Sequence, residues 1–350
     1  MRLPAVASSC AAAATEALAT EATTQLPTCT TPEDMLRGSW FVNNTGLIEP
    51  RTGTLSVAAS NFLSVWDVAK QFHWQPLTCN FNVFANEAEV ARVLDRRHVV
   101  FVGDSTLVEQ FMIVTELVRH NSWTLANNAP SLRTELVKAG IAKMRLFDSG
   151  FRLGRFTLRF LWNGAPNVVD NAWGLRVFDD ADWLARFQAF VRAPVSLQKQ
   201  PTIMFIGSGL HDVSSKNIYF NFDAFRVQVR SALAKAMATG AKVFWVSASP
   251  KFRGSACPKK TPSYALGNPG VSAINRIARQ VVENVTVVPR GQHRPLFIAW
   301  DRLREGSPLE GDGIHCVRDY ALLSNWHGKK HFGASCVTRA MLLLNIIANH

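Results

Sequence analysis

The feature that most constrains the fold is the alternation of short apolar runs with helical segments from residue 97 onward. The first run, Arg97-His98-Val99-Val100-Phe101-Val102, is continuous and short, which is typical of a strand buried on both faces. Helical spacing follows at 105–119, where Asp104 or Ser105 can cap the helix. Strands separated by helices predict a parallel sheet covered by helices on both faces.

The same alternation continues to the end of the sequence. Further strands are expected at 156–162, 202–206, 242–246 and 296–300. Further helices are expected at 181–192, 223–239 (stopped by Gly240), 271–285 and 333–348. In strand 156–162 apolar residues alternate with Thr157 and Arg159, and Arg155 precedes them on the same side. That arginine face suits a sugar-binding cleft.

The chain divides into a leader and one domain. Residues 1–35 are rich in Ala and Thr without apolar periodicity, and we expect a leader or disordered segment outside the fold. It reads as a weak signal peptide, the remnant of an anchor or a transit-like leader. The rest, 36–350, is expected to be a single domain without internal repeats, with an irregular N-terminal wrap at 36–95 and an α/β core at 96–350.

Charge and hydropathy exclude several classes of protein. The formal net charge of +12, from 38 Lys and Arg against 26 Asp and Glu, favours anionic partners. The charge is spread along the chain, without a nucleic-acid module, so a basic but ordinary surface is favoured and no nucleic-acid partner is expected. No apolar run approaches the roughly 18 residues of a membrane span, so we expect none in this chain.

Cysteines and glycosylation sequons point to an oxidising compartment. None of the six cysteines (Cys10, Cys29, Cys79, Cys257, Cys316 and Cys336) forms a C-x-x-C pair. Two N-glycosylation sequons occur, Asn43-Asn44-Thr45 and Asn284-Val285-Thr286. Together these features favour the secretory pathway, either the Golgi lumen or the extracellular space.

Polar residues follow the first, the third and the last of the expected strands. In parallel sheets, ligands bind at the carboxyl ends of the strands. Gly103-Asp104-Ser105-Thr106 follows the first strand, and Gly207-Ser208-Gly209-Leu210-His211-Asp212 follows the third. Gly311-Asp312-Gly313-Ile314-His315 lies between the last strand and the last helix. Taken alone, each segment has a simpler explanation: the first as a helix cap, the second as a glycine-rich turn and the third as a chance occurrence of D-x-x-H. Their joint order predicts one site, with Ser105 as nucleophile and the Asp312–His315 pair as its base.

The surroundings of Ser105 exclude some alternatives. They do not match the G-x-S-x-G elbow of the α/β-hydrolases. No phosphate-binding loop and no G-x-G-x-x-G follows the first strand, so a nucleotide cofactor is not indicated.

At these residues the chain resembles the SGNH/GDSL hydrolase superfamily. G-D-S at 103–105, G-x-H-D at 209–212 and D-x-x-H at 312–315 carry the resemblance. Within the superfamily the chain is similar to the PC-esterase branch, which includes the trichome-birefringence-like polysaccharide O-acetyltransferases and the luminal domain of the sialic acid O-acetyltransferases. That branch's G-x-W and W-x-P-x-x-C motifs occur here as Gly38-Ser39-Trp40 and Trp74-Gln75-Pro76-Leu77-Thr78-Cys79.

The resemblance implies a flavodoxin-like three-layer α/β sandwich with a central parallel sheet. It also implies that Ser105 attacks an acyl carbonyl, His315 moves the proton and Asp312 orients His315. The oxyanion and substrate residues would be Gly103, Asp104, Asn163, Gly164, Gly209 and His211. His211 stands where the hydrolases of this superfamily carry Asn, and an imidazole can donate a hydrogen bond in its place.

The cysteines are expected to form disulfides, and metal binding is the alternative. Cys29 and Cys79 bracket the N-terminal wrap and are expected to pair, and Cys316 is expected to pair with Cys336 or Cys257. In the alternative, Cys316, His327, His331 and Cys336 form a metal set, but their spacing fits no standard zinc knuckle, so no metal is expected.

The expected function is transfer or hydrolysis of an O-acyl group, preferably acetyl, on a glycan or polysaccharide. The resemblance favours a transferase, and no cofactor is expected to be resident, although acetyl-CoA could serve as acyl donor. Two alternatives remain: a non-catalytic glycan-binding or secreted interaction module on the same fold, and a polyanion-binding protein.

Overall fold

A computed structural model describes the core of the chain. The described residues are 26–42, 72–82, 84, 87–104, 106–108, 110–111, 114–115, 124–125, 148–153, 155–163, 174–194, 197, 200–209, 221–248, 267–304, 330–331 and 334–350.

The centre of the fold is a six-stranded sheet in the order β5-β6-β3-β7-β8-β9. Its strands are β3 (His98–Gly103), β5 (Asp148–Leu153), β6 (Phe156–Trp162), β7 (Ile203–Gly207), β8 (Lys242–Val246) and β9 (Leu296–Ile298). The last five in the sheet order are parallel, and β5 is an antiparallel strand at the edge beside β6. Along the chain the parallel strands take the order second, first, third, fourth, fifth, which is the flavodoxin-like order. The expected fold class is confirmed.

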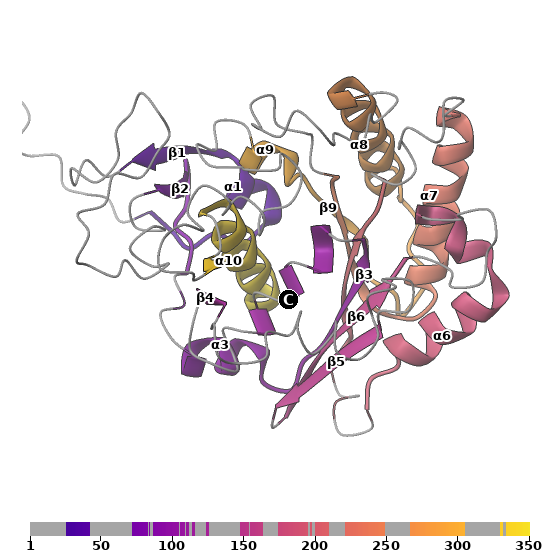
Figure 1. The fold of residues 1–350 in the computed structure, drawn as a ribbon, viewed down its shortest axis with the longest axis horizontal. Coiled ribbons are helices and arrows are strands. Elements are labelled where there is room, and N and C mark those ends of the chain that lie inside the picture. Colours follow the sequence, from indigo (N-terminus) through magenta and orange to yellow (C-terminus); the bar gives the residue numbers. More distant parts are fainter. Residues whose placement is uncertain are drawn as a thin grey trace, which may run out of the picture.

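Helices cover both faces of this sheet (Figure 1). One layer holds α6 (Ala181–Val191), α7 (Phe222–Met237) and α8 (Gly267–Glu283), preceded by a 3-10 helix at Gly174–Asp179. The other holds α3 (Glu87–Leu94), α9 (Asp301–Arg304), α10 (Ala334–Asn349) and the helical residues after β3. The arrangement follows from β3 itself: Val99 and Phe101 pack into one core, and Val100 and Val102 into the other.

The N-terminal segment enters the fold earlier than the sequence predicted. Helix α1 (Pro32–Leu36) begins inside the expected leader, and Cys29 and Met35 are fully buried. Cys29 forms a disulfide with Cys79, as expected, and the Trp74 indole N–H donates to the Met35 carbonyl at 2.8 Å. These long-range contacts place Cys29, Pro32, Met35 and Leu36 in the core, which their local composition does not reveal.

The stretch expected to be irregular contains a strand pair. β1 (Gly38–Val42) and β2 (Phe72–Pro76) pair antiparallel, and β2 contacts helix α1. Gly38 faces the Gln75 carbonyl so closely that a Cβ there would lie 2.3 Å from its oxygen. Glycine is therefore needed for the two strands to approach. A second short pair joins β4 (Thr124–Leu125) to β10 (Lys330–His331).

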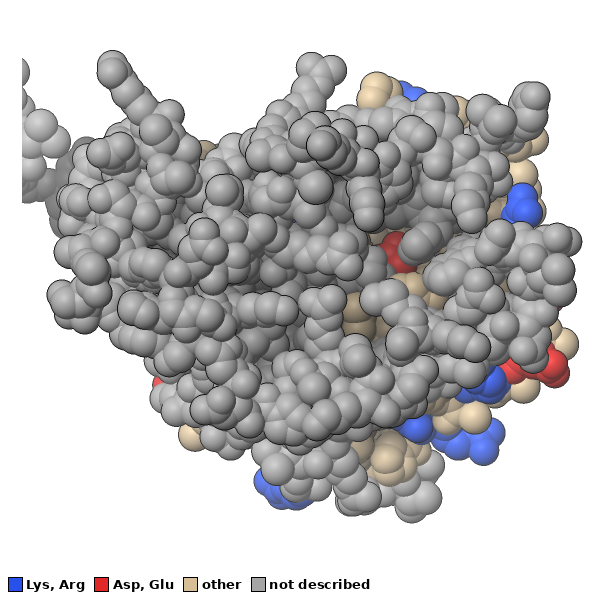
Figure 2. Space-filling view, viewed as in Figure 1, with Lys and Arg blue, Asp and Glu red and all other residues tan. Residues whose placement is uncertain are grey.

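The described surface is mixed in charge. Figure 2 shows basic and acidic side chains together on the side where Figure 1 draws α6. Among the described residues no helix has the length and apolarity needed to cross a membrane.

Candidate active site

The carboxyl end of β3 places the candidate nucleophile at the start of a helix. The buried Asp104 side chain accepts hydrogen bonds from the Thr106 backbone N–H (2.9 Å) and the Thr106 hydroxyl (2.7 Å). The Asp104 carbonyl accepts from the N–H groups of Leu107 and Val108, each at 3.1 Å. Of the two residues that could cap this helix, Asp104 has the capping contacts. Ser105, between these partners, lies outside the described residues.

Gly103 is required by the close approach of neighbouring strands. A Cβ at Gly103 would lie 2.5 Å from the Gly207 carbonyl oxygen and 2.9 Å from the Leu107 side chain. Any larger residue would push β3 and β7 apart where both strands end, directly before Ser105.

Asn163 joins the ends of three strands. Its backbone N–H donates to the Gly103 carbonyl at 3.0 Å, and its side-chain Nδ2 donates to Ser208 Oγ at 2.9 Å. Its own carbonyl accepts from the Gly174 N–H at 3.1 Å. The side chain is 1% exposed, and its Oδ1 has no hydrogen-bond partner among the described residues. A buried amide oxygen without a partner is costly unless a ligand or water meets it.

Gly209, after β7, has a backbone conformation that favours glycine. Its φ is +132°, and a Cβ there would lie 2.6 Å from Ile274 Cδ1 on α8. His211, the predicted oxyanion residue two positions further along the sequence, lies outside the described residues.

Polar side chains that the sequence analysis did not single out close the ends of β8 and β9. Ser247 Oγ donates to Asp301 Oδ1 at 2.8 Å and accepts from the Asp301 N–H at 3.0 Å. Asn275 forms a two-way pair with the Ala248 backbone, each bond 2.8 Å. Ser247 directly follows β8, and Asp301 is the first residue of α9. These positions at strand and helix ends were a signal that could have identified both residues from the sequence.

The predicted site is thus described in part. The structure places four predicted residues at or just after the ends of the neighbouring strands β3, β6 and β7: Gly103, Asp104, Asn163 and Gly209. Five predicted residues lie outside the described residues: Ser105, Gly164, His211, Asp312 and His315. Of the alternative metal set, Cys316 and His327 lie outside as well, and the described residues contain no group of three metal-binding side chains.

Arg159 on β6 and Arg155 just before it do not form the expected sugar-binding face. The Arg159 guanidinium lies 3.9 Å from the centre of the Phe190 ring and donates to the Phe190 carbonyl at 2.9 Å. Arg155 pairs with Asp95 at 2.7 Å, before the start of β6 and therefore at the opposite edge of the sheet from the site. Each arginine therefore binds a neighbouring segment of the chain, at Phe190 and at Asp95 respectively. Residues alternate along a strand regardless of what covers each face, so the pattern alone could not distinguish a cleft from a helix contact.

The marked pKa shifts lie at the amino end of the sheet, away from this site. Burial lowers the pKa of His98 from 6.5 to about 4, and its Nδ1 is hydrogen-bonded to the Thr157 hydroxyl. Burial, followed by the positive charge of Arg97, also lowers the pKa of Lys242.

Comparisons with known proteins yield structural likeness only. No family model matches the chain, and no curated protein matches its sequence. A GDSL-like lipase from Bacteroides thetaiotaomicron aligns with 70% of this chain and 96% of its own at 15% identity and a TM-score of 0.32. An acetylxylan esterase from Geobacillus stearothermophilus aligns with 67% of this chain and 94% of its own at 14% identity and a TM-score of 0.33. Values this low carry no argument about chemistry, and the fold class rests on the strand order.

Proposed function

We propose that this chain is a serine-dependent acyl esterase or acyltransferase of the SGNH/GDSL kind. The observation that carries the proposal is the contact of Asn163 with both Gly103 and Ser208, which holds the ends of β3, β6 and β7 together; Gly103 lies two residues before Ser105 in the sequence. G-D-S and G-x-H-D lie at the ends of the first and third parallel strands, β3 and β7, which are neighbours in the sheet, so we expect them at the same carboxyl edge. D-x-x-H at 312–315 precedes the last helix in the sequence, and we propose that it joins the same site.

The proposed reaction has two half-reactions. Ser105 Oγ attacks the acyl carbonyl while His315 takes its proton, and His315 then donates that proton to the departing alcohol or thiol. Asp312 holds His315 in the required tautomer. Water or a sugar hydroxyl next attacks the acyl-serine while His315 takes the proton of the incoming group. The acyl–Oγ bond then breaks, and His315 returns that proton to Ser105 Oγ, which regenerates the serine.

The oxyanion would be stabilised at the start of the helix that Asp104 caps. Backbone N–H groups in a first helical turn lack carbonyl partners within the helix and can donate to a developing negative charge. Asn163 contributes if its amide turns over: Oδ1 then accepts from the Ser208 hydroxyl, and Nδ2 becomes free to donate. The Ser208 hydroxyl can serve either orientation, because it both donates and accepts.

The finer assignment extends the resemblance. We propose an O-acetyl group on a glycan or polysaccharide as the substrate, transfer rather than hydrolysis as in the PC-esterase branch, and acetyl-CoA as a candidate donor. We place the protein in the secretory pathway, in the Golgi lumen or outside the cell. The buried Cys29–Cys79 disulfide supports an oxidising compartment.

The test is intact-mass analysis after incubation with 4-nitrophenyl acetate. Wild type should gain one acetyl group that maps to Ser105, and Ser105→Ala and His315→Ala should not. Ser231→Ala is the matched control, because Ser231 lies on α7 and bonds only the exposed Asp179 carboxylate among the described groups. Folded wild type with no adduct and no nitrophenol release would contradict the proposal for simple acetyl esters, and glycan arrays would then test the binding module.

A further inference from the structure

A groove between α7 and α8 lies outside the proposed active site. Its volume is about 670 Å³, and its walls come from α7, the end of α8 and the segment that follows α8. The floor is apolar, with Leu233, Met237 and Val281 buried. At the rim, Val287 is 82% exposed, the most exposed of the large apolar side chains described.

Among the described residues, the polar side chains that line the groove carry guanidinium or carboxamide groups and no carboxylate. They belong to Arg226, Arg230, Gln280, Asn284 and Gln292. Such groups donate hydrogen bonds to hydroxyl and carbonyl oxygens without demanding a charged partner.

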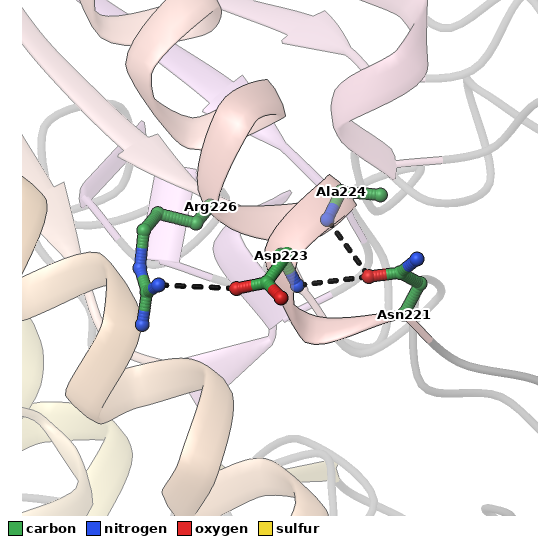
Figure 3. A network of polar contacts seen from close by, with 4 residues as sticks. All are labelled: Asn221, Asp223, Ala224 and Arg226. Carbon is green, nitrogen blue, oxygen red and sulfur yellow. Dashed lines mark hydrogen bonds and ion pairs between the residues drawn. The ribbon is translucent and has the colours of Figure 1, made fainter.

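The start of α7 holds one of these groups in place (Figure 3). Asn221 Oδ1 accepts from the N–H groups of Asp223 and Ala224, which caps the helix. Arg226 donates to Asp223 Oδ1 at 3.1 Å. The pair with Asp223 therefore positions the Arg226 guanidinium beside the groove, where its other N–H groups can donate to an occupant.

The groove contains the acceptor residue of the sequon Asn284-Val285-Thr286. Asn284 directly follows the last residue of α8, and both Asn284 and Thr286 are exposed. The Asn284 backbone N–H donates to the Gln280 carbonyl at 3.1 Å, and its side chain makes no hydrogen bond to any described residue. An exposed sequon after a helix end is accessible to modification.

We propose that Asn284 carries an N-linked glycan whose first sugars lie in the groove between α7 and α8. The donor is an oligosaccharide linked to a polyprenyl diphosphate: a bond forms between Asn284 Nδ2 and the sugar's anomeric carbon, the bond from that carbon to the diphosphate breaks, and an Nδ2 proton is lost. Sugar hydroxyls accept from Arg230 and Gln292, and C–H faces cover Val287. The exposed Val287 side chain is then shielded from water.

This proposal is independent of whether Ser105 is a nucleophile. It requires only passage through a compartment with N-glycosylation, for which the Cys29–Cys79 disulfide is a separate indication.

Occupancy is tested by passing the full chain through the endoplasmic reticulum of a eukaryotic cell and mapping its peptides, whether the protein is secreted or retained. Wild type and Thr286→Ser, which keeps the sequon, should carry a mass removed by peptide N-glycosidase from the Asn284 peptide. Thr286→Val should lose that mass while retaining Asn284. Peptide mapping separates this glycan from any at Asn43. An unmodified Asn284 in folded wild type would overturn the proposal.

Placement of the sugars is tested with an arginine-specific reagent. Arg230 should react more slowly in glycosylated wild type than in Thr286→Val, with a single residual sugar left by an endoglycosidase giving an intermediate rate. Arg92, exposed on α3 in the opposite layer, is the internal control and should react equally in all forms. Equal Arg230 reactivity with and without the glycan would refute the placement in the groove.

Discussion

Burial of His98 makes a specific contribution to how stability depends on pH. The side chain is 1% exposed, and its pKa falls from 6.5 to about 4, mainly because burial disfavours the charged ring and secondarily because of nearby Arg159. Backbone carbonyls of Phe190 and Val191 oppose the shift without reversing it. The folded protein therefore keeps His98 neutral at pH values where the unfolded chain protonates it.

The sign and size of the effect follow from linkage. Above pH 6.5 the His98 ring is neutral in both the folded and the unfolded state, so its titration takes nothing from the free energy of unfolding. Between pH 6.5 and about 4 the unfolded state binds the extra proton, and the free energy of unfolding falls by about 1.4 kcal/mol per pH unit. From pH 7 to pH 5 the expected loss due to His98 is about 2 kcal/mol.

The assay compares wild type with His98→Asn in urea unfolding at pH 7, 6 and 5, followed by tryptophan fluorescence. The buried Trp183 and Trp245 provide the signal. The variant is less stable throughout, but its loss between pH 7 and pH 5 should be smaller than that of wild type by about 2 kcal/mol. Other groups with lowered pKa values, His293 and His350, cancel in this comparison. Equal losses in the two proteins would refute the argument.

Three further predictions address the disulfide and the site. Replacing Cys29 and Cys79 together by Ser should lower the free energy of unfolding by about 2–5 kcal/mol in denaturant titrations, since the bond closes a separation of 50 residues; wild-type stability in the double variant would contradict this. Gly209→Ala should cost about 1–3 kcal/mol because of its positive φ, measured as a lower Tm, whereas an unchanged Tm would show that the turn can relax. If Asn163 serves the oxyanion, Asn163→Ala should lower kcat for 4-nitrophenyl acetate by about 10²–10³-fold, and Ser208→Ala should have a smaller effect. A loss of stability in Asn163→Ala with kcat unchanged would reduce Asn163 to a structural link.

The sequence by itself determined the parallel core. The expected strands 156–162 and 242–246 coincide with β6 and β8, and the others agree within two residues at each end. These strands are buried on both faces and separated by helices, so apolar runs with intervening helical periodicity were enough to identify them. The glycine after β7 also indicated the turn there, since Gly209 has a positive φ, whereas Gly103 is required by the close approach of Gly207.

Only the tertiary structure decided which strands became neighbours and which polar groups met. No apolar run marks the edge strand β5, or β1 and β2, as strands. Their pairing depends on partners elsewhere in the fold. The contact of Asn163 with Ser208 spans 45 residues and exists only because β6 and β7 flank β3. The stacking of Arg159 on Phe190 is likewise a product of packing. Periodicity specifies which face of an element is apolar, but the contacts that complete a site depend on the order in which the sheet assembles.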